Sequence, residues 1–183
     1  MDFTPSTMPQ EADACSSSGT VCSYATKQWG PLPSSLEANV KASMMYRISA
    51  VFLLLLATGH LLGFRQSDPT WGVDGLLASM RSIHFNVQGF DRTYWDLFEA
   101  AGFCVGILYI FAAILAWQLG SLPPASLTLL RGTSWAFALC FAAITIVSWK
   151  FLFVLPIAFS VVITLCLTVA AWLSAQQAST QPR

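Results

Sequence analysis

The chain has 183 residues, of which 55% are hydrophobic and only 10% charged, and its nine basic and nine acidic residues give a formal net charge of zero. Soluble domains carry about 25% charged residues, so a surface that mainly faces water is excluded. Nucleic-acid binding is also excluded, because it depends on a concentration of basic residues. No two of the five cysteines have Cys-x-x-Cys spacing, so no thioredoxin-like or zinc-knuckle site is predicted.

Residues 1–43 are polar, rich in Ser, Thr, Pro and Ala, and have no periodic apolar stripe. This composition buries too little apolar surface to offset chain entropy, so we expect a disordered tail. It is not a signal peptide, because the first apolar run begins only near Met45. The stretch from Val40 to Arg47 resembles the N-terminus of a native protein. The alternative is therefore that the tail is not part of the native product. Cys15 and Cys22 of the tail would pair only in an oxidising compartment.

Four apolar segments follow, each near the length of about 20 residues that a helix needs to cross a hydrocarbon layer of about 30 Å. They run from about Tyr46 to Phe64, Leu97 to Leu119, Leu127 to Trp149 and Phe151 to Ser174. The sequence therefore predicts an all-α membrane protein, with a four-helix transmembrane bundle over residues 44–175 and a short polar tail over 176–183.

Aromatic and basic residues flank these segments. Tryptophans, which favour membrane interfaces, fall near segment ends on the side of the chain termini (Trp117, Trp135, Trp172) and on the opposite side (Trp71, Trp95, Trp149). The basic residues are almost evenly divided between the side of the termini (Lys41, Arg47, Arg131) and the other side (Arg65, Arg81, Arg92, Lys150). The positive-inside rule therefore does not orient the chain. A polar tail without a signal favours both termini inside.

The second apolar segment contains a Gly-x-x-x-Gly pair, Gly102 and Gly106, and Ala113 continues the row of small residues. Such residues mark packing faces in lipid, because they let helix backbones approach closely. We expect this face to pack inside the bundle, with a homo-oligomer formed through Gly102 and Gly106 as the alternative.

The connection from Arg65 to Asp96 is the longest between spans. Its apolar residues recur at helical spacing and predict a short amphipathic helix on the membrane or against the bundle (Leu76, Leu77, Met80, Ile83, Val87). The densest polar cluster of the chain follows this stripe (His84, Asn86, Gln88, Asp91, Arg92, Tyr94, Asp96, Glu99). We take His84, Arg92, Tyr94 and Asp96 as candidate binding residues.

A purely structural interpretation of this cluster competes with the functional one. Thr93 and Asp96 have the spacing of a capping box at the start of the second span. Acidic residues in a first turn also interact favourably with the helix dipole. Arg92 and Asp96, four residues apart, have the spacing of a surface ion pair.

His60 and Glu99 are the candidates for acid/base chemistry, because both enter apolar segments from the same side of the membrane. An ionisable group in the apolar layer is energetically costly and usually has a partner. For Glu99, the candidate partners are His60, Arg92 and Lys150. The structural alternative is that His60 bonds to a neighbouring backbone group. His60 and His84 are also the only pair of possible haem ligands, but nothing else supports haem. We expect no metal site and no cofactor.

From Met45 to the end, the chain resembles a family of small bacterial four-helix membrane proteins of unknown function. The residues that carry the resemblance are Gly59-His60, Met80-Arg81 to Phe85, Arg92 to Phe98 and Trp117 to Gly120. The resemblance implies a four-helix fold in a bacterial inner membrane, and it implies no activity, cofactor or catalytic residue.

Two classes of function remain open. The first is a non-catalytic membrane component that binds lipid or a lipophilic ligand in the bundle, or stabilises a partner. The second is a membrane-embedded isomerase or cyclase that acts on a lipophilic small molecule through Glu99 and His60. We favour the first, because no nucleophile, metal-ligand set or phosphate-binding loop is present in the sequence.

Four spans place both ends of the bundle on one side of the membrane, which reporter fusions at residues 42, 68, 122 and 180 would test. We expect fusions at 42, 122 and 180 to report the same side and the fusion at 68 the opposite one. A fusion at 68 that reports the side of residue 42 would remove the first span.

Overall fold

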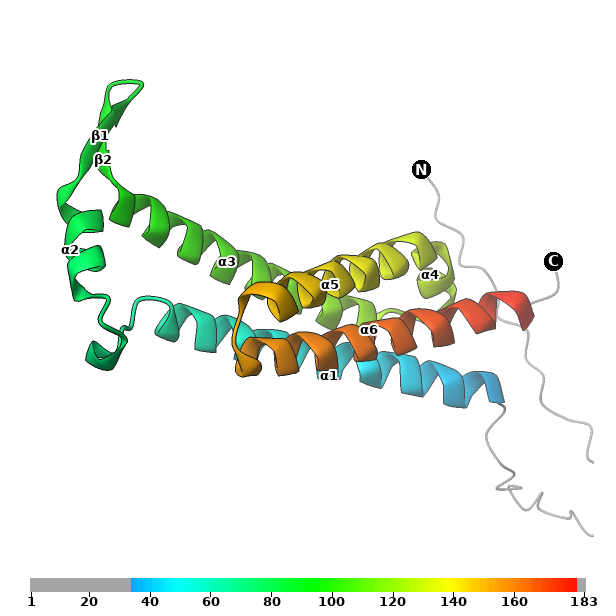
Figure 1. Cartoon of the computed structure of the whole chain (residues 1–183). Helices are drawn as coiled ribbons and strands as arrows, with labels where there is room; N and C mark the ends of the chain where they lie inside the picture. Colours follow the sequence, from blue (N-terminus) through cyan, green and yellow to red (C-terminus); the bar gives the residue numbers. More distant parts are fainter. Residues whose placement is uncertain (1–33, 181–183) are drawn as a thin grey trace, which may run out of the picture. The chain divides into compact units, whose positions relative to one another are not determined.

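The computed structural model describes residues 34–180, a range that is mostly helical (Figure 1). Four helices are long and apolar enough to cross a membrane: α1 (Ser34–Gly63), α3 (Tyr94–Ser121), α5 (Arg131–Phe151) and α6 (Val154–Thr180). This confirms the predicted all-α class with four spanning helices. The shorter elements are a 3-10 helix η1 (Pro69–Trp71), α2 (Asp74–Ser82), β1 (His84–Val87), β2 (Phe90–Thr93) and α4 (Pro124–Leu129).

The boundary predicted for the N-terminal tail is wrong, because residues 34–43 form the first turns of α1. Glu37 and Lys41 pair one turn apart at 3.6 Å, and Ala42 is fully buried in the core. The helix thus gains tertiary contacts that its polar composition did not indicate. At the other end, the predicted polar tail is also helical as far as residue 180. Residues 1–33, with Cys15 and Cys22, and residues 181–183 lie outside the described part.

Helix α1 is central to the packing, since it lies along α3 and along α6, and α6 in turn lies along α5 (Figure 1). The largest buried side chains of the core are Tyr46 and Leu53 of α1 and Ile163 and Leu167 of α6. Between them the core consists largely of alanine, which allows the close helix packing that membranes require. A hydrogen bond between the Thr145 and Thr164 hydroxyls, at 2.9 Å, adds a polar link between α5 and α6.

The Gly-x-x-x-Gly pair of α3 faces α1. A Cβ atom placed on Gly102 would overlap the Phe64 ring, and one placed on Gly106 would overlap Leu61. The expected use inside the bundle is therefore the one observed, and α1 covers the surface that a second copy would need. Near the opposite end of α3, the Ser43 hydroxyl donates a hydrogen bond to the Gly120 carbonyl.

The outward faces of the four long helices are apolar. Leu55 of α1, Phe111 of α3, Val147 of α5 and Leu165 of α6 are each more than half exposed. Contiguous apolar surface of this extent is rare on water-soluble monomers, whereas lipid covers it in a membrane. Trp95 and Trp117 lie about 33 Å apart along α3 at 1.5 Å per residue, close to the thickness of a hydrocarbon layer. The chain is a multi-pass membrane protein.

The connection between α1 and α3 differs from the prediction in its second half. The amphipathic helix α2 ends at Ser82, and the apolar stripe was extended wrongly to Val87, which lies in β1. Strands β1 and β2 pair antiparallel around Gln88 and Gly89, whose φ angles of 54° and 86° form a two-residue turn. Gly89, at the second position of the turn, is a sequence signal for a hairpin. The prediction missed it because the apolar residues before it recur at helical spacing.

The third span is also shorter than predicted, because Leu127 belongs to α4 and not to the long helix. α4 begins after Pro123, whose extended backbone ends the preceding connection. Leu127 is buried in the core, so α4 closes the end of the bundle at which α1 begins.

The contact of α1 with Gly106 can be tested by Gly106→Val in detergent. We expect the free energy of unfolding to fall by about 1–3 kcal/mol, because the new side chain would overlap Leu61 in a packed interface. Gly59→Val is the matched control, since a Cβ atom on Gly59 meets no atom within 4 Å. Equal melting temperatures of the two variants would contradict the packing described here.

Candidate functional site

Glu99 is held by an ion pair at the end of the α1–α3 interface. Its carboxylate lies 3.0 Å from Nε of Arg65, and its side chain is 26% exposed. The prediction of partial burial with a cationic partner is confirmed, but the three candidate partners were wrong. Arg65 follows Phe64, the residue just after α1 whose ring packs on Gly102, so Arg65 reaches Glu99, one turn before Gly102. This register between two helices could not be derived from spacing within either one.

His60 lies deeper in the same interface. Its Nε2 lies 3.0 Å from the carbonyl oxygen of Gly102 and donates the hydrogen bond. The ring stacks on Phe64, with centroids 5.4 Å apart, and meets the edge of Tyr109 at 6.0 Å. The structural alternative for His60, a bond to a neighbouring backbone group, is therefore the arrangement observed.

His60 and Glu99, the two acid/base candidates, have different partners. Among the residues that the structure describes, no hydrogen bond joins His60 to Glu99. The acid is paired with Arg65 and the imidazole with a carbonyl group. An arrangement for proton transfer would need both groups directed at one bound molecule.

The candidate binding residues lie on the hairpin and in the first turn of α3, and each has local contacts. His84 Nδ1 lies 3.2 Å from the Asp91 carboxylate, and both side chains are more than half exposed. The Arg92 guanidinium donates to the Asp91 carbonyl at 2.9 Å, and not to Asp96. The Tyr94 ring packs on Phe85 at 5.1 Å.

Asp96 completes the predicted capping box. The Thr93 amide donates to its carboxylate at 2.8 Å, and the Asp96 amide donates to the Thr93 hydroxyl at 3.2 Å. The hairpin is thus joined to α3 by a structural device. These four candidates have local structural roles, and they are spread over an exposed surface.

The two histidines lie in different parts of the structure and do not form a pair. His60 lies inside the α1–α3 interface and His84 on the exposed hairpin, and each has a ring nitrogen engaged by its own neighbours. Across residues 34–180, no three His, Cys, Asp or Glu side chains are grouped closely enough to hold a metal ion.

A hollow of about 510 Å³ lies in the loop after α1, lined by Gly63, Gln66, Ser67, Asp68, Pro69 and Trp71. The Thr70 hydroxyl and amide donate to the Asp68 carboxylate at 2.7 and 2.8 Å and lower the pKa of that carboxyl. Asp68 therefore caps η1, and its carboxylate has a structural role in this turn.

Two further hollows lie along the α1–α3 pair, and the sequence reasoning did not find them. The first, of about 380 Å³, is an apolar groove lined by Ala50, Val51, Leu54, Ala113, Ile114, Trp117 and Gln118. Ala50 and Ala113 are buried and form its floor, whereas Val51, Leu54 and Ile114 are about half exposed at its rim. We call this hollow the chain groove.

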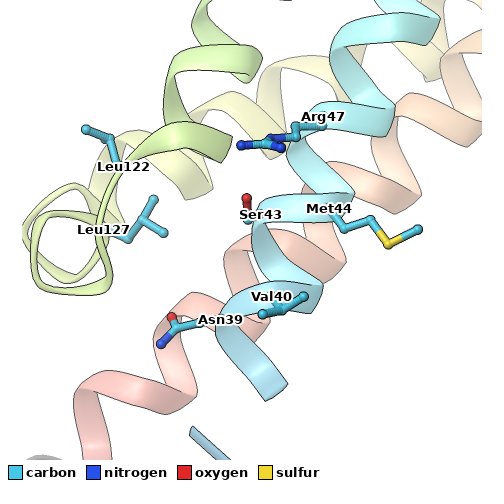
Figure 2. Close-up of a pocket in the computed structure, with 7 residues that line it drawn as sticks. All are labelled: Asn39, Val40, Ser43, Met44, Arg47, Leu122 and Leu127. Atoms are coloured by element: carbon cyan, nitrogen blue, oxygen red, sulfur yellow. The ribbon is translucent and has the colours of Figure 1, made fainter. Parts of the chain in front are cut away.

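The second hollow, of about 460 Å³, is lined by Asn39, Val40, Ser43, Met44, Arg47, Leu122 and Leu127 (Figure 2). Figure 2 shows the Arg47 side chain extending from α1 toward the ribbon of α3. Its guanidinium lies 5.5 Å from the centre of the Trp117 ring, which also lines the chain groove. Arg47 therefore lies between the two hollows. A basic residue in α1 and a tryptophan in α3 were visible in the sequence, but their contact was not.

Comparisons with protein-family models, with curated proteins and with solved structures find no match to this chain.

The Arg65–Glu99 pair can be tested by charge exchange. We expect Glu99→Lys to lower the free energy of unfolding by about 1 kcal/mol, because it removes a half-exposed ion pair and places two cations together. The double variant Arg65→Glu/Glu99→Lys should recover part of this loss in thermal melts in detergent. Glu99→Gln, which keeps the shape, should be the mildest change. A double variant no more stable than Glu99→Lys would show that the pair does not stabilise the fold.

Proposed function

We propose that this chain is a non-catalytic membrane component that binds a membrane lipid, with one acyl chain in the chain groove between α1 and α3. The observation that carries the proposal is the groove itself, an apolar channel on the outer face of the helix pair. The resemblance noted above supports a bacterial inner membrane as its location.

The groove would bind an acyl chain through its shape, and not through the hydrophobic effect. Lipid tails are already in an apolar medium, so burying one in the protein gains nothing from removal of water. Retention depends on dispersion contacts, each worth about 0.1–0.2 kcal/mol, with walls that are already in place. The walls are pre-formed, because the floor residues Ala50 and Ala113 belong to the buried α1–α3 contact.

The alternative, an acid/base enzyme, has less support. It requires His60 and Glu99 to act on one molecule, whereas the first is bonded to Gly102 and the second to Arg65. Each contact also contributes to the joining of α1 and α3. A structural role accounts for both residues without a substrate.

Filling the groove tests the proposal. We expect Val51→Trp to reduce the lipid that co-purifies with the protein, measured by native mass spectrometry after extraction in a mild detergent. Val51 is 52% exposed at the groove rim, so the larger ring can occupy the hollow without entering the core. Because the ring takes the place of an acyl chain, the amount of bound lipid should fall while the melting temperature is maintained.

Val147→Trp is the matched control, because Val147 is 56% exposed on α5 and does not line the groove. It should retain lipid like the parent. Equal lipid retention by the parent, Val51→Trp and Val147→Trp would refute binding in the groove. Absence of retained lipid from the parent would refute the proposed function itself.

A further inference from the structure

Arg47 is a cation next to Trp117 of the chain groove, and no acidic side chain pairs with it among the residues that the structure describes. Among the described residues, the ion pairs join Lys41 to Glu37, Arg65 to Glu99 and His84 to Asp91, and none includes Arg47. Its aliphatic stem is close to Gly120, where an added Cβ atom would lie 3.1 Å from Arg47 Cγ. Its guanidinium lies over the Trp117 ring. These contacts hold the Arg47 side chain in place, and its positive charge is available to pair with an anionic ligand.

Aromatic residues place Arg47 at the level of lipid headgroups. Trp117 contacts it directly, and the neighbouring Tyr46 lies beside Ser134 of α5 and Ser174 of α6. Trp135 adjoins the first serine and Trp172 is two residues from the second, so Trp117, Trp135 and Trp172 belong to one end of the bundle. Tryptophan rings concentrate where headgroups meet hydrocarbon. The contact with Trp117 therefore indicates that the guanidinium belongs to the headgroup region.

The two hollows follow one another along α1 on either side of Arg47. Residues 39–44 line the hollow on the side of the helix start, and residues 50–54 line the chain groove on the side of the membrane interior. The first hollow contains the Asn39 carboxamide and Ser43, and the second is almost entirely apolar. The hollow with the more polar lining, the cation and the apolar groove thus have the order of headgroup, phosphate and acyl chain in a lipid.

Resting on the proposed function, we propose that the bound lipid is an anionic glycerophospholipid whose phosphate pairs with Arg47. A zwitterionic lipid presents the same phosphate, but its ammonium group would be repelled by the nearby guanidinium. A lipid such as phosphatidylglycerol brings a net negative charge with no such repulsion. Basic pockets between transmembrane helices favour anionic headgroups for this reason.

Competition between two lipids of identical acyl chains tests the headgroup assignment. Purified full-length protein in detergent is mixed with equal amounts of phosphatidylglycerol and phosphatidylcholine, and bound lipid is counted by native mass spectrometry. We expect the parent to prefer phosphatidylglycerol, and Arg47→Gln to lose about fivefold of that preference, the factor that one near-surface basic residue supplies. Arg47→Lys should retain most of it, because the charge remains.

Arg131→Gln is the matched control, since it removes an exposed basic residue at the start of α5 that lines neither hollow. Its preference for phosphatidylglycerol should fall less than that of Arg47→Gln, because Arg131 lines neither hollow. An unchanged preference in Arg47→Gln would overturn the proposal. Equal retention of both lipids by the parent would also overturn it while leaving the proposed function intact, whereas retention of neither lipid would remove the proposed function.

A label on the unaltered protein locates the lipid even if Arg47→Gln fails to fold. One equivalent of phosphatidylglycerol with a diazirine in its acyl chain is photolysed with the protein in detergent. The label should fall on the tryptic peptides of residues 48–65 and 93–131, at Val51, Leu54 or Ile114. Labelling confined to residues 132–150 of α5 would overturn the proposal.

Discussion

The close approach of α1 and α3 over three glycines is the constraint on which the rest of the structure depends. In a membrane, helices gain little from hydrophobicity and depend on contact, so glycine lets Leu61 and Phe64 fill the space that side chains would occupy. This contact brings His60 to the Gly102 carbonyl and, one turn further, Arg65 to Glu99. The polar groups at this end are therefore consequences of glycine packing.

At the opposite end, the same helix pair lines the two hollows on which the proposed function rests. Gly120 lets Ser43 bond to its carbonyl and the Arg47 stem lie against α3. The buried alanines between these ends leave the backbones close and the outer face grooved. In the proposed function, the ligand of these hollows is a lipid, which is also the solvent of the spanning helices.

The connection formed by α2 and the β1–β2 hairpin shows that a local sequence pattern can predict the wrong element. The stripe from Leu76 to Val87 fits a helix, yet the chain turns into a strand after Ser82. The Gln88–Gly89 turn and the Thr93 cap together place the hairpin against the start of α3. Two short-range signals, a glycine turn and a capping box, outweighed apolar periodicity over a few residues.

The sequence by itself determined the four spans, the cap at Thr93 and the small-residue face at Gly102, because each depends on residues near one another in the chain. It did not determine the start of α1, which depends on burial of Ala42, or the partner of Glu99. The α1–α3 groove and the place of Arg47 were likewise decided only by the tertiary structure. The reason is that these features require the rotation and register of one helix against another, which no periodicity within a single helix contains.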